Sequence, residues 1–222
     1  MMELRGGHPP RVRLPKFYPI LDSVVAAARG YDPLEAAEQI ISAGAGILQF
    51  RHKSFVTRET LATLERLAAM CREAGIPFVV NDRADLAVLV RAALHLGQDD
   101  LPPRAARRVT GADTVIGFST HNEAQLRAAA DEPVDYVALG PIFGTASKQN
   151  PDPVVGVAEL RRLRPLTGRP LVAIGGITRE NARGVVEAGA DSVAVIGDLF
   201  PVADSSGGIR ARIREWLDVL GG

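Results

Sequence analysis

Eight short apolar runs recur along the chain, and longer amphipathic stretches separate them. The runs are continuously apolar and do not alternate with polar residues, which is typical of strands buried on both faces of a parallel sheet that helices cover. The predicted strands are 17–21, 47–50, 78–80, 93–96, 115–118, 136–139, 171–174 and 192–196. An eightfold strand–helix alternation favours a (β/α)8 TIM barrel over its alternative, an open doubly wound sheet.

Helix start and stop signals lie between these runs. Asp32 is typical of an N-cap and is followed by a proline, and Gly44 marks the end of that helix. Thr57 and Gly75 bound the next helix in the same way, and another is predicted over about 178–187. The last helix places four apolar residues on one face, namely Ile209, Ile213, Trp216 and Leu220.

The length of 222 residues with 46% hydrophobic content indicates a single domain. We expect residues 1–16 to form a flexible N-terminal arm and residues 17–222 to form the barrel catalytic domain. The net charge is zero, with 26 basic and 26 acidic residues, which argues against nucleic-acid or anionic-membrane partners. A lone Cys71 and the lack of a signal-peptide or membrane-spanning run predict a cytoplasmic protein. The sequence does not decide between a monomer and a homo-oligomer.

Polar residues gather where the predicted strands end. In a barrel, active groups come from the carboxyl ends of the strands, so these residues are the candidates for a site. They are Asp22, Gln49, Arg51, His52, Lys53, Asn81, Asp82, Arg83, Gln98, Asp99, Asp100, Ser119, His121, Thr145, Ser147 and Lys148.

The last two strands end differently, in Gly175-Gly176 and in Gly197. A glycine turn between strand and helix lets backbone N–H groups approach a phosphate at the positive end of the following helix. The loops after strands seven and eight are the usual phosphate site of a barrel. We therefore predict phosphate binding here, although tight turns elsewhere also use paired glycines.

Asp82 and Asp100 follow neighbouring strands, so both can reach the same side of the barrel mouth. Carboxylates on adjacent strands suit Mg²⁺, which takes one or two of them together with waters and substrate phosphate oxygens. The alternative is an N-cap role for Asp82 and a solvated turn at Asp99-Asp100. Arg51, Lys53 and Lys148 add cations that can hold a diphosphate, unless they are ordinary solvated side chains.

His52 and His121 are acid–base candidates by residue type, but neither has an evident partner in the sequence, and a surface or helix-capping role also accounts for each. The chain has no metal-site spacing of Cys and His, no serine nucleophile elbow and no Gly-x-Gly-x-x-Gly motif. Zinc, acyl-transfer and dinucleotide chemistry therefore lack support.

Six segments in order resemble the thiamine-phosphate synthase family over about residues 17 to 200. They are FYPILD at 17–22, QFRHK at 49–53, NDR at 81–83, HLGQDD at 95–100, GPIF at 140–143 and AIGGIT at 173–178. The resemblance implies a (β/α) barrel that condenses a hydroxymethylpyrimidine diphosphate with a thiazole phosphate, giving thiamine phosphate and diphosphate.

The resemblance also implies residue roles. Asp82 and Asp100 would bind the cofactor Mg²⁺, and Arg51, Lys53 and Lys148 would be the catalytic cations. The pyrimidine diphosphate would be bound by Gln49, Arg51, Lys53, Asn81, Ser119 and Lys148. The thiazole phosphate would be bound by Thr145, Ser147, Gly176 and the Ile196-Gly197 backbone. The implied mechanism is dissociative, with diphosphate leaving before the thiazole nitrogen attacks.

The chain departs from the family pattern at a few positions. His52 replaces a usual acidic residue, Gly144 a common proline and Gly197 a common serine. The stretch after Asp82 is about one residue short, which leaves Asp99 and Asp100 as competing metal ligands. The rival interpretations are a thiazole tautomerase that uses His121 without a metal, and a non-catalytic barrel that binds a phosphate ligand.

Overall fold

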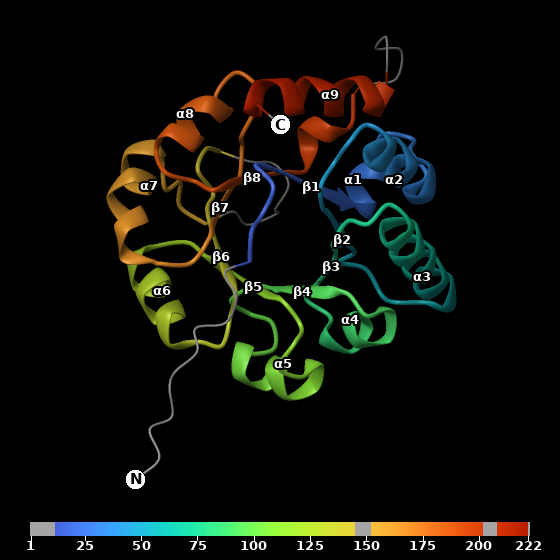
Figure 1. Cartoon of the computed structure of the whole chain (residues 1–222), viewed down its shortest axis with the longest axis horizontal. Helices are drawn as coiled ribbons and strands as arrows, with labels where there is room; N and C mark the ends of the chain where they lie inside the picture. Colours follow the sequence, from blue (N-terminus) through green and yellow to red (C-terminus); the bar gives the residue numbers. More distant parts are fainter. Residues whose placement is uncertain (1–11, 145–151, 202–207, 222) are drawn as a thin grey trace.

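The computed structural model describes residues 12–144, 152–201 and 208–221, and its eight parallel strands close into one barrel (Figure 1). Each strand pairs with its neighbours in the chain, and β1 pairs with β8 to complete the ring. The strands are β1 (Phe17–Asp22), β2 (Leu48–Arg51), β3 (Phe78–Asn81), β4 (Ala93–Leu96), β5 (Ile116–Thr120), β6 (Tyr136–Leu139), β7 (Leu171–Ile174) and β8 (Ser192–Val195). The predicted TIM barrel is confirmed, and the open sheet is excluded.

Helices surround the strands as an outer ring (Figure 1). The α-helices are α1 (Ser23–Ala28), α2 (Pro33–Ser42), α3 (Arg58–Glu73), α4 (Ala84–Val90), α5 (Pro103–Thr110), α6 (Glu123–Ala128), α7 (Val157–Leu163), α8 (Ala182–Glu187) and α9 (Gly208–Leu220). Short 3-10 turns are η1 (Ala129–Asp131), η2 (Arg164–Leu166) and η3 (Gly197–Leu199). In Figure 1, α9 closes the ring between α8 and the α1–α2 pair.

Alternate residues of each strand face two different cores, which explains why the runs are continuously apolar. In β1, Phe17 and Leu21 pack against the helices, whereas Tyr18 and Ile20 point into the barrel. Successive side chains of a strand point to opposite faces, and here both faces are covered. The interior is filled by Tyr18, Ile20, Ile47, Val79, Tyr136, Ala138, Val172 and Ala194.

The helix signals of the sequence are confirmed in α2 and α3. The Asp32 carboxylate accepts from the N–H of Leu34 at 2.8 Å, and Thr57 forms a capping box with Thr60 at the start of α3. The helix predicted over 178–187 was too long, because α8 begins only at Ala182. The residues before it form a turn that side-chain hydrogen bonds hold.

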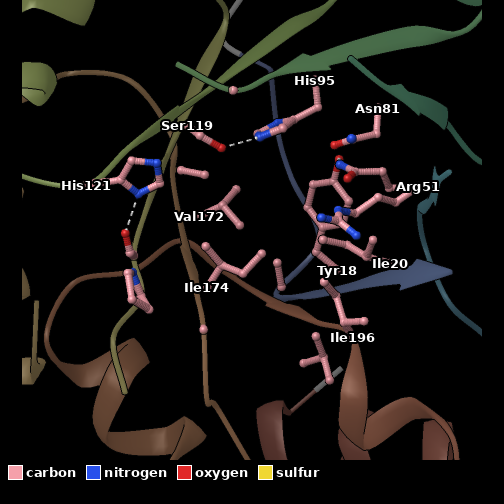
Figure 2. Close-up of a pocket in the computed structure, with 18 of the residues that line it drawn as sticks. Tyr18, Ile20, Arg51, Asn81, His95, Ser119, His121, Val172, Ile174 and Ile196 are labelled. Carbon is pink, nitrogen blue, oxygen red and sulfur yellow. Dashed lines mark hydrogen bonds between the residues drawn. The ribbon is translucent and has the colours of Figure 1, made fainter. Parts of the chain in front are cut away.

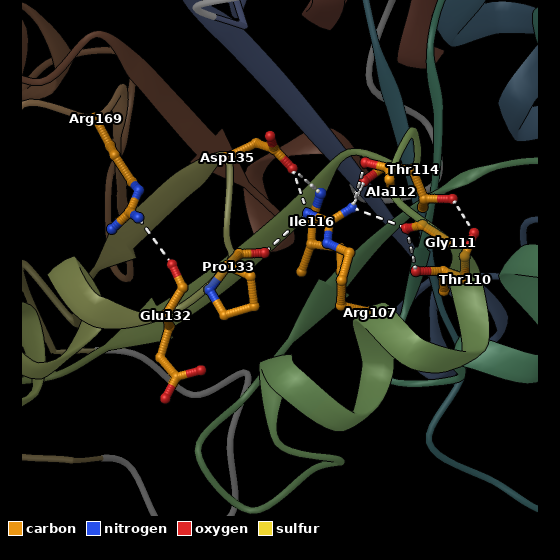
Figure 3. A network of polar contacts seen from close by, with 10 residues as sticks. All are labelled: Arg107, Thr110, Gly111, Ala112, Thr114, Ile116, Glu132, Pro133, Asp135 and Arg169. Atoms are coloured by element: carbon orange, nitrogen blue, oxygen red, sulfur yellow. Dashed lines mark hydrogen bonds and ion pairs between the residues drawn. The ribbon is translucent and has the colours of Figure 1, made fainter. Parts of the chain in front are cut away.

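The amino end of the barrel is closed by packing and by arginine contacts. Leu14 packs against the interior cluster, and the carbonyl of Lys16 accepts from Val193 N–H at 2.7 Å. Figure 3 shows Arg107 of α5 among the chain segments before β5 and β6, where it donates to backbone carbonyls and pairs with Asp135 at 3.0 Å. Residues 1–11 of the expected arm lie outside the described residues.

Candidate active site

A cavity of about 660 Å³ opens at the carboxyl ends of the strands. Ten of the predicted site residues line it, and they come from six of the eight strands or from the loops that follow them. These ten are Gln49, Arg51, Lys53, Asn81, Asp82, Asp100, Ser119, Gly176, Ile196 and Gly197. Thr145, Ser147 and Lys148 lie outside the described residues. The structure thus gathers into one cavity every described residue to which the family resemblance assigned a role, whereas the candidates Asp22, His52 and Arg83 do not line it.

Several of these residues lie within strands, although we predicted strand ends before Arg51, Asn81 and Ser119. Gln49 and Arg51 belong to β2, Asn81 to β3 and Ser119 to β5. Strand alternation turns them inward, and Figure 2 shows Arg51 and Asn81 across the cavity from His121. Their backbones are therefore fixed by the sheet, which makes the polar wall of the cavity rigid.

Asp82 and Asp100 lie together, with their carboxyl groups hydrogen-bonded to each other. Burial and the Asp100 carboxyl raise the pKa of Asp82 to about 6. Burial opposes ionisation of Asp100 too, but hydrogen bonds from Asp82 and from Gly97 N–H at 2.7 Å lower its pKa. Lys53 forms an ion pair with Asp82. Asp82 therefore takes up a proton more readily than an exposed aspartate does, and the two neighbouring carboxyl groups suit a small divalent cation.

The backbone of Asp82 is left-handed, with φ of 65°, and its N–H donates to the carbonyl of His95 at 2.7 Å. Aspartate and asparagine adopt this conformation more readily than other side-chain-bearing residues. Asp99 also lines the cavity but is exposed and makes no contact with Asp82 that the described residues show. The geometry therefore places Asp100, and not Asp99, beside Asp82.

Arg51 is oriented by Asp22, a candidate to which the sequence analysis assigned no role. One carboxylate oxygen of Asp22 accepts from Val24 and Val25 N–H, both at 3.0 Å, and caps α1. The other oxygen pairs with the Arg51 guanidinium. Because Asp22 is only 2% exposed, the pair is shielded from water and holds Arg51 against the cavity wall.

The β7–α8 turn presents backbone to the cavity. Gly175 and Gly176 have φ of 100° and 63°, and a Cβ on Gly176 would lie 2.4 Å from the Gly144 carbonyl oxygen. Asn181 braces the turn, since its Oδ1 accepts from Thr178 N–H at 2.9 Å and its Nδ2 donates to the Gly176 carbonyl at 3.3 Å. Among the described residues, the N–H groups of Gly176 and Ile177 donate to no other group. They are free to bind an anion.

A buried chain of hydrogen bonds crosses the cavity floor. The Gln49 amide, the Tyr18 and Tyr136 hydroxyls, the His95 ring and the Ser119 hydroxyl follow one another at 2.9 to 3.0 Å. Burial raises the pKa of Tyr18 to about 12 and lowers the pKa of His95 to about 4. Both groups are therefore neutral near pH 7.

The two candidate histidines differ in place. His121 lies in the cavity wall, where its Nδ1 contacts the Gly140 carbonyl at 2.6 Å (Figure 2) and its Nε2 lies 3.5 Å from Asp152. A carbonyl only accepts, so Nδ1 carries the proton. His52 stacks on Phe50 and contacts Ser23, away from the cavity. A surface or capping role thus fits His52 but not His121.

Sequence reasoning missed Tyr18, His95 and Tyr136 as site residues, and it assigned no role to the candidate Asp22. Strand alternation could have indicated both residues of the first pair. Tyr18 lies two positions before Ile20, which points into the barrel, and His95 lies two positions before Gly97, which lines the cavity. No sequence signal indicated Tyr136, whose ring crosses the barrel only because Gly117 lies beside it. A Cβ at Gly117 would lie 2.0 Å from the Tyr136 ring.

These features define a single-domain (β/α)8 barrel with a polar cavity at its carboxyl end. The family model described as thiamine monophosphate synthase matches residues 17–199, so the chain belongs to that family. Membership makes it a transferase of thiamine biosynthesis.

Individual relatives agree with this assignment. A thiamine-phosphate synthase of Koribacter versatilis is 47% identical over 216 residues, covering 94% of this chain and 97% of that protein. One of Shouchella clausii is 40% identical, covering 79% and 84%. The solved thiamine phosphate pyrophosphorylase of Pyrococcus furiosus superposes with a TM-score of 0.80 at 29% identity, covering 93% and 95%. A tryptophan synthase α-subunit, at 15% identity and a TM-score of 0.67, shares the fold alone.

Proposed function

We propose that the chain condenses 4-amino-2-methyl-5-(diphosphooxymethyl)pyrimidine with 4-methyl-5-(2-phosphooxyethyl)thiazole to give thiamine phosphate and diphosphate. The observation that carries the proposal is a single cavity whose two ends each offer groups suited to binding an anion. Backbone N–H groups after β7 form one end, and Arg51, Lys53 and the Asp82–Asp100 pair form the other. Such an arrangement suits two phosphorylated substrates bound side by side.

The diphosphate end fits Mg²⁺ as cofactor. Two hard oxygen-ligand groups are in contact, and no cluster of three or more potential ligands occurs among the described residues, so substrate oxygens and waters would complete the coordination. Mg²⁺ bound there by Asp82 and Asp100 would neutralise charge on the leaving diphosphate. Lys53 and Arg51 bind the same diphosphate, and Arg51 can do so with a fixed orientation because Asp22 holds it.

The heterocycle of the donor would lie on the floor formed by Tyr18 and Tyr136, between Gln49 and Ser119. Asn81 is 9% exposed and lines the same wall. The turn at Gly176, with the backbone of Ile196 and Gly197, would hold the thiazole phosphate. Catalysis then consists of leaving-group stabilisation and positioning of two substrates, so a general base is not required. Roles for Thr145, Ser147 and Lys148 stay part of the proposal.

Purified protein with both substrates and Mg²⁺ tests the proposal directly. We expect thiamine phosphate and diphosphate in equal amounts, and loss of both products when a chelator removes the metal. The tautomerase alternative gains support from the place of His121 in the cavity wall. Isomerisation of the thiazole without condensation, abolished in His121→Asn, would establish that alternative and refute ours. Binding of phosphate ligands with no turnover would instead support a non-catalytic barrel.

Among the described residues, no helix is long and apolar enough to cross a membrane. The cytoplasmic location, the absence of nucleic-acid partners and the choice between monomer and homo-oligomer stay predictions from the sequence. Size-exclusion chromatography with light scattering measures the oligomeric state directly.

A further inference from the structure

The floor of the cavity carries polar groups that the proposed reaction does not use for chemistry. The side chains of Tyr18, Tyr136 and His95 make no hydrogen bond to either end among the described residues, yet they form an unbroken hydrogen-bond chain between Gln49 and Ser119. Buried polar groups are costly unless each is satisfied, so such a chain has to be consistent from end to end. Its consistency restricts which proton each group holds.

The direction of the chain follows from its first link. Nε2 of Gln49 lies 2.9 Å from the Tyr18 hydroxyl and donates to it. Tyr18 then donates its own proton to Tyr136, at 2.9 Å, because among the described residues this buried phenol has no other acceptor. Tyr136 in turn donates to Nδ1 of His95, at 3.0 Å.

The neutral His95 ring has a single N–H. Because Nδ1 accepts, the proton lies on Nε2, which donates to the Ser119 hydroxyl at 2.9 Å. Figure 2 shows this contact at the cavity wall. The hydroxyl proton of Ser119 is then left for a ligand. At the other end, Oε1 of Gln49 accepts from no other group among the described residues and remains an acceptor.

We infer that this chain runs in one direction, from Gln49 to Ser119, and makes Gln49 a hydrogen-bond acceptor and Ser119 a donor toward the bound heterocycle. Tyr136 and His95 are positioning residues that hold this direction. The ligand selected is a flat ring that offers an amino N–H on one side and a ring-nitrogen lone pair on another. An aminopyrimidine has this pattern, whereas an oxopyrimidine presents the reverse at the same edge.

Gly117 leaves the space that the Tyr136 ring needs in the middle of this hydrogen-bond chain. A side chain at this position would overlap the Tyr136 ring, with its Cβ 2.4 Å from the Tyr136 hydroxyl oxygen. The register of β5 against β6 places Gly117 opposite Tyr136. The phenol can therefore cross the barrel and reach both Tyr18 and His95.

The first test reads the histidine tautomer by ¹⁵N NMR of the uniformly labelled protein, with His95→Gln to assign the ring signals. We expect the Nε2–H tautomer for His95 near pH 7. The Nδ1–H tautomer would reverse the chain and overturn the inference. A purely structural role for His95 makes no such prediction of tautomer.

The second test measures binding by calorimetry without turnover. The probes are 4-amino-5-hydroxymethyl-2-methylpyrimidine and its 4-oxo analogue. We expect the unmodified protein to bind the amino compound at least about tenfold more tightly, because the oxo compound would leave buried groups unpaired. Tyr136→Phe breaks the chain and should reduce that preference to within about threefold.

Tyr31→Phe is the matched control, because it removes a tyrosine hydroxyl that contacts Pro201 outside the cavity. It should keep the full preference. Tyr18→Phe breaks the same chain one link earlier and replaces Tyr136→Phe if that variant folds poorly. An undiminished preference for the amino compound in a folded chain-breaking variant would overturn the inference.

The inference rests on the proposed function, but the experiments distinguish a failure of the inference from a failure of the proposed function. Absence of thiamine phosphate formation would refute the function, while the tautomer and the amino preference would still establish the direction of the chain. Normal product formation with the Nδ1–H tautomer would refute the direction and leave the function intact.

Discussion

Asp82 has a left-handed backbone, and burial together with the Asp100 carboxyl raises the pKa of its side chain to about 6. Its left-handed φ of 65° turns the carboxyl toward Asp100, while Lys53 pairs with it from the loop after β2. Non-glycine residues in this conformation cluster at functional sites, where the surrounding structure holds them. The sequence predicted the two aspartates as a pair but left open which neighbour, Asp99 or Asp100, completes it.

Asp82→Asn tests the metal role with little change of shape, because asparagine also tolerates the left-handed backbone. We expect kcat to fall roughly 10²-fold and the Mg²⁺ concentration for half-maximal rate to rise. Steady-state assays across a Mg²⁺ titration measure both. Asp100→Asn should behave alike, and the adjacent Asp99→Asn is the matched comparison. Equal damage from Asp99→Asn and Asp100→Asn would contradict the assignment of Asp100.

His95 makes stability depend on pH. Its pKa is about 4 in the folded protein because the ring is buried, against 6.5 for an exposed histidine. Between these pH values the unfolded chain binds a proton that the folded chain does not, so stability falls as pH drops from about 6.5 toward 4. At pH 5 the loss from this group is about 2 kcal/mol.

Chemical denaturation at pH 7.5 and pH 5 measures this loss. Asp82 has the opposite effect on stability. Because burial and Asp100 raise its pKa to about 6, the folded protein binds a proton there at a higher pH than the unfolded chain does, and this favours folding as the pH falls. Because His95→Gln retains Asp82, the contribution of Asp82 cancels when this variant is compared with the unmodified protein. The variant should lose less stability on acidification than the unmodified protein, and equal losses would refute the argument.

At the scale of elements, the strands were predictable and one helix boundary was not. Each strand is buried on both faces, so its apolar run is unbroken and its existence is plain. The start of α8 at Ala182 depends on Asn181, whose side chain holds Thr178 N–H and the Gly176 carbonyl. Such a turn competes with the helix and resembles a helix start in sequence alone.

The β7–α8 turn is also where a single methyl group should affect one substrate only. Gly176→Ala places a Cβ 2.4 Å from the Gly144 carbonyl oxygen and strains a φ of 63°. The turn must shift, so KM for the thiazole phosphate should rise at least about tenfold, with a smaller change for the pyrimidine. Gly184→Ala, in α8 with open space around it, is the control and should leave both KM values unchanged. A selective effect on the pyrimidine would invert our placement of the two substrates.

Across the whole molecule, one end of the barrel forms the candidate active site and the other end contributes to stability. The carboxyl end carries the cavity, whereas the amino end carries arginine contacts that tie connecting segments together. Arg107 donates to carbonyls of Gly111, Ala112 and Pro133 and pairs with Asp135, whose carboxylate also accepts from Ile116 N–H at 2.8 Å. A similar arrangement recurs between Arg164 and Asp191, which accepts from Leu171 N–H at 2.8 Å.

This division predicts that a change at the amino end alters stability and leaves activity intact. Arg107→Met keeps most of the side-chain volume but leaves several carbonyls without their donor and Asp135 without its ion-pair partner, so unfolding should be easier by about 2–4 kcal/mol. Thermal unfolding should show a Tm lower by on the order of 10 °C. Arg108→Met, the exposed neighbour on α5, should change Tm little. Because the cavity is built from the opposite strand ends, kcat and both KM values of Arg107→Met should match those of the unmodified protein at a temperature where it is folded. A lowered kcat there would show that the two ends of the barrel are coupled.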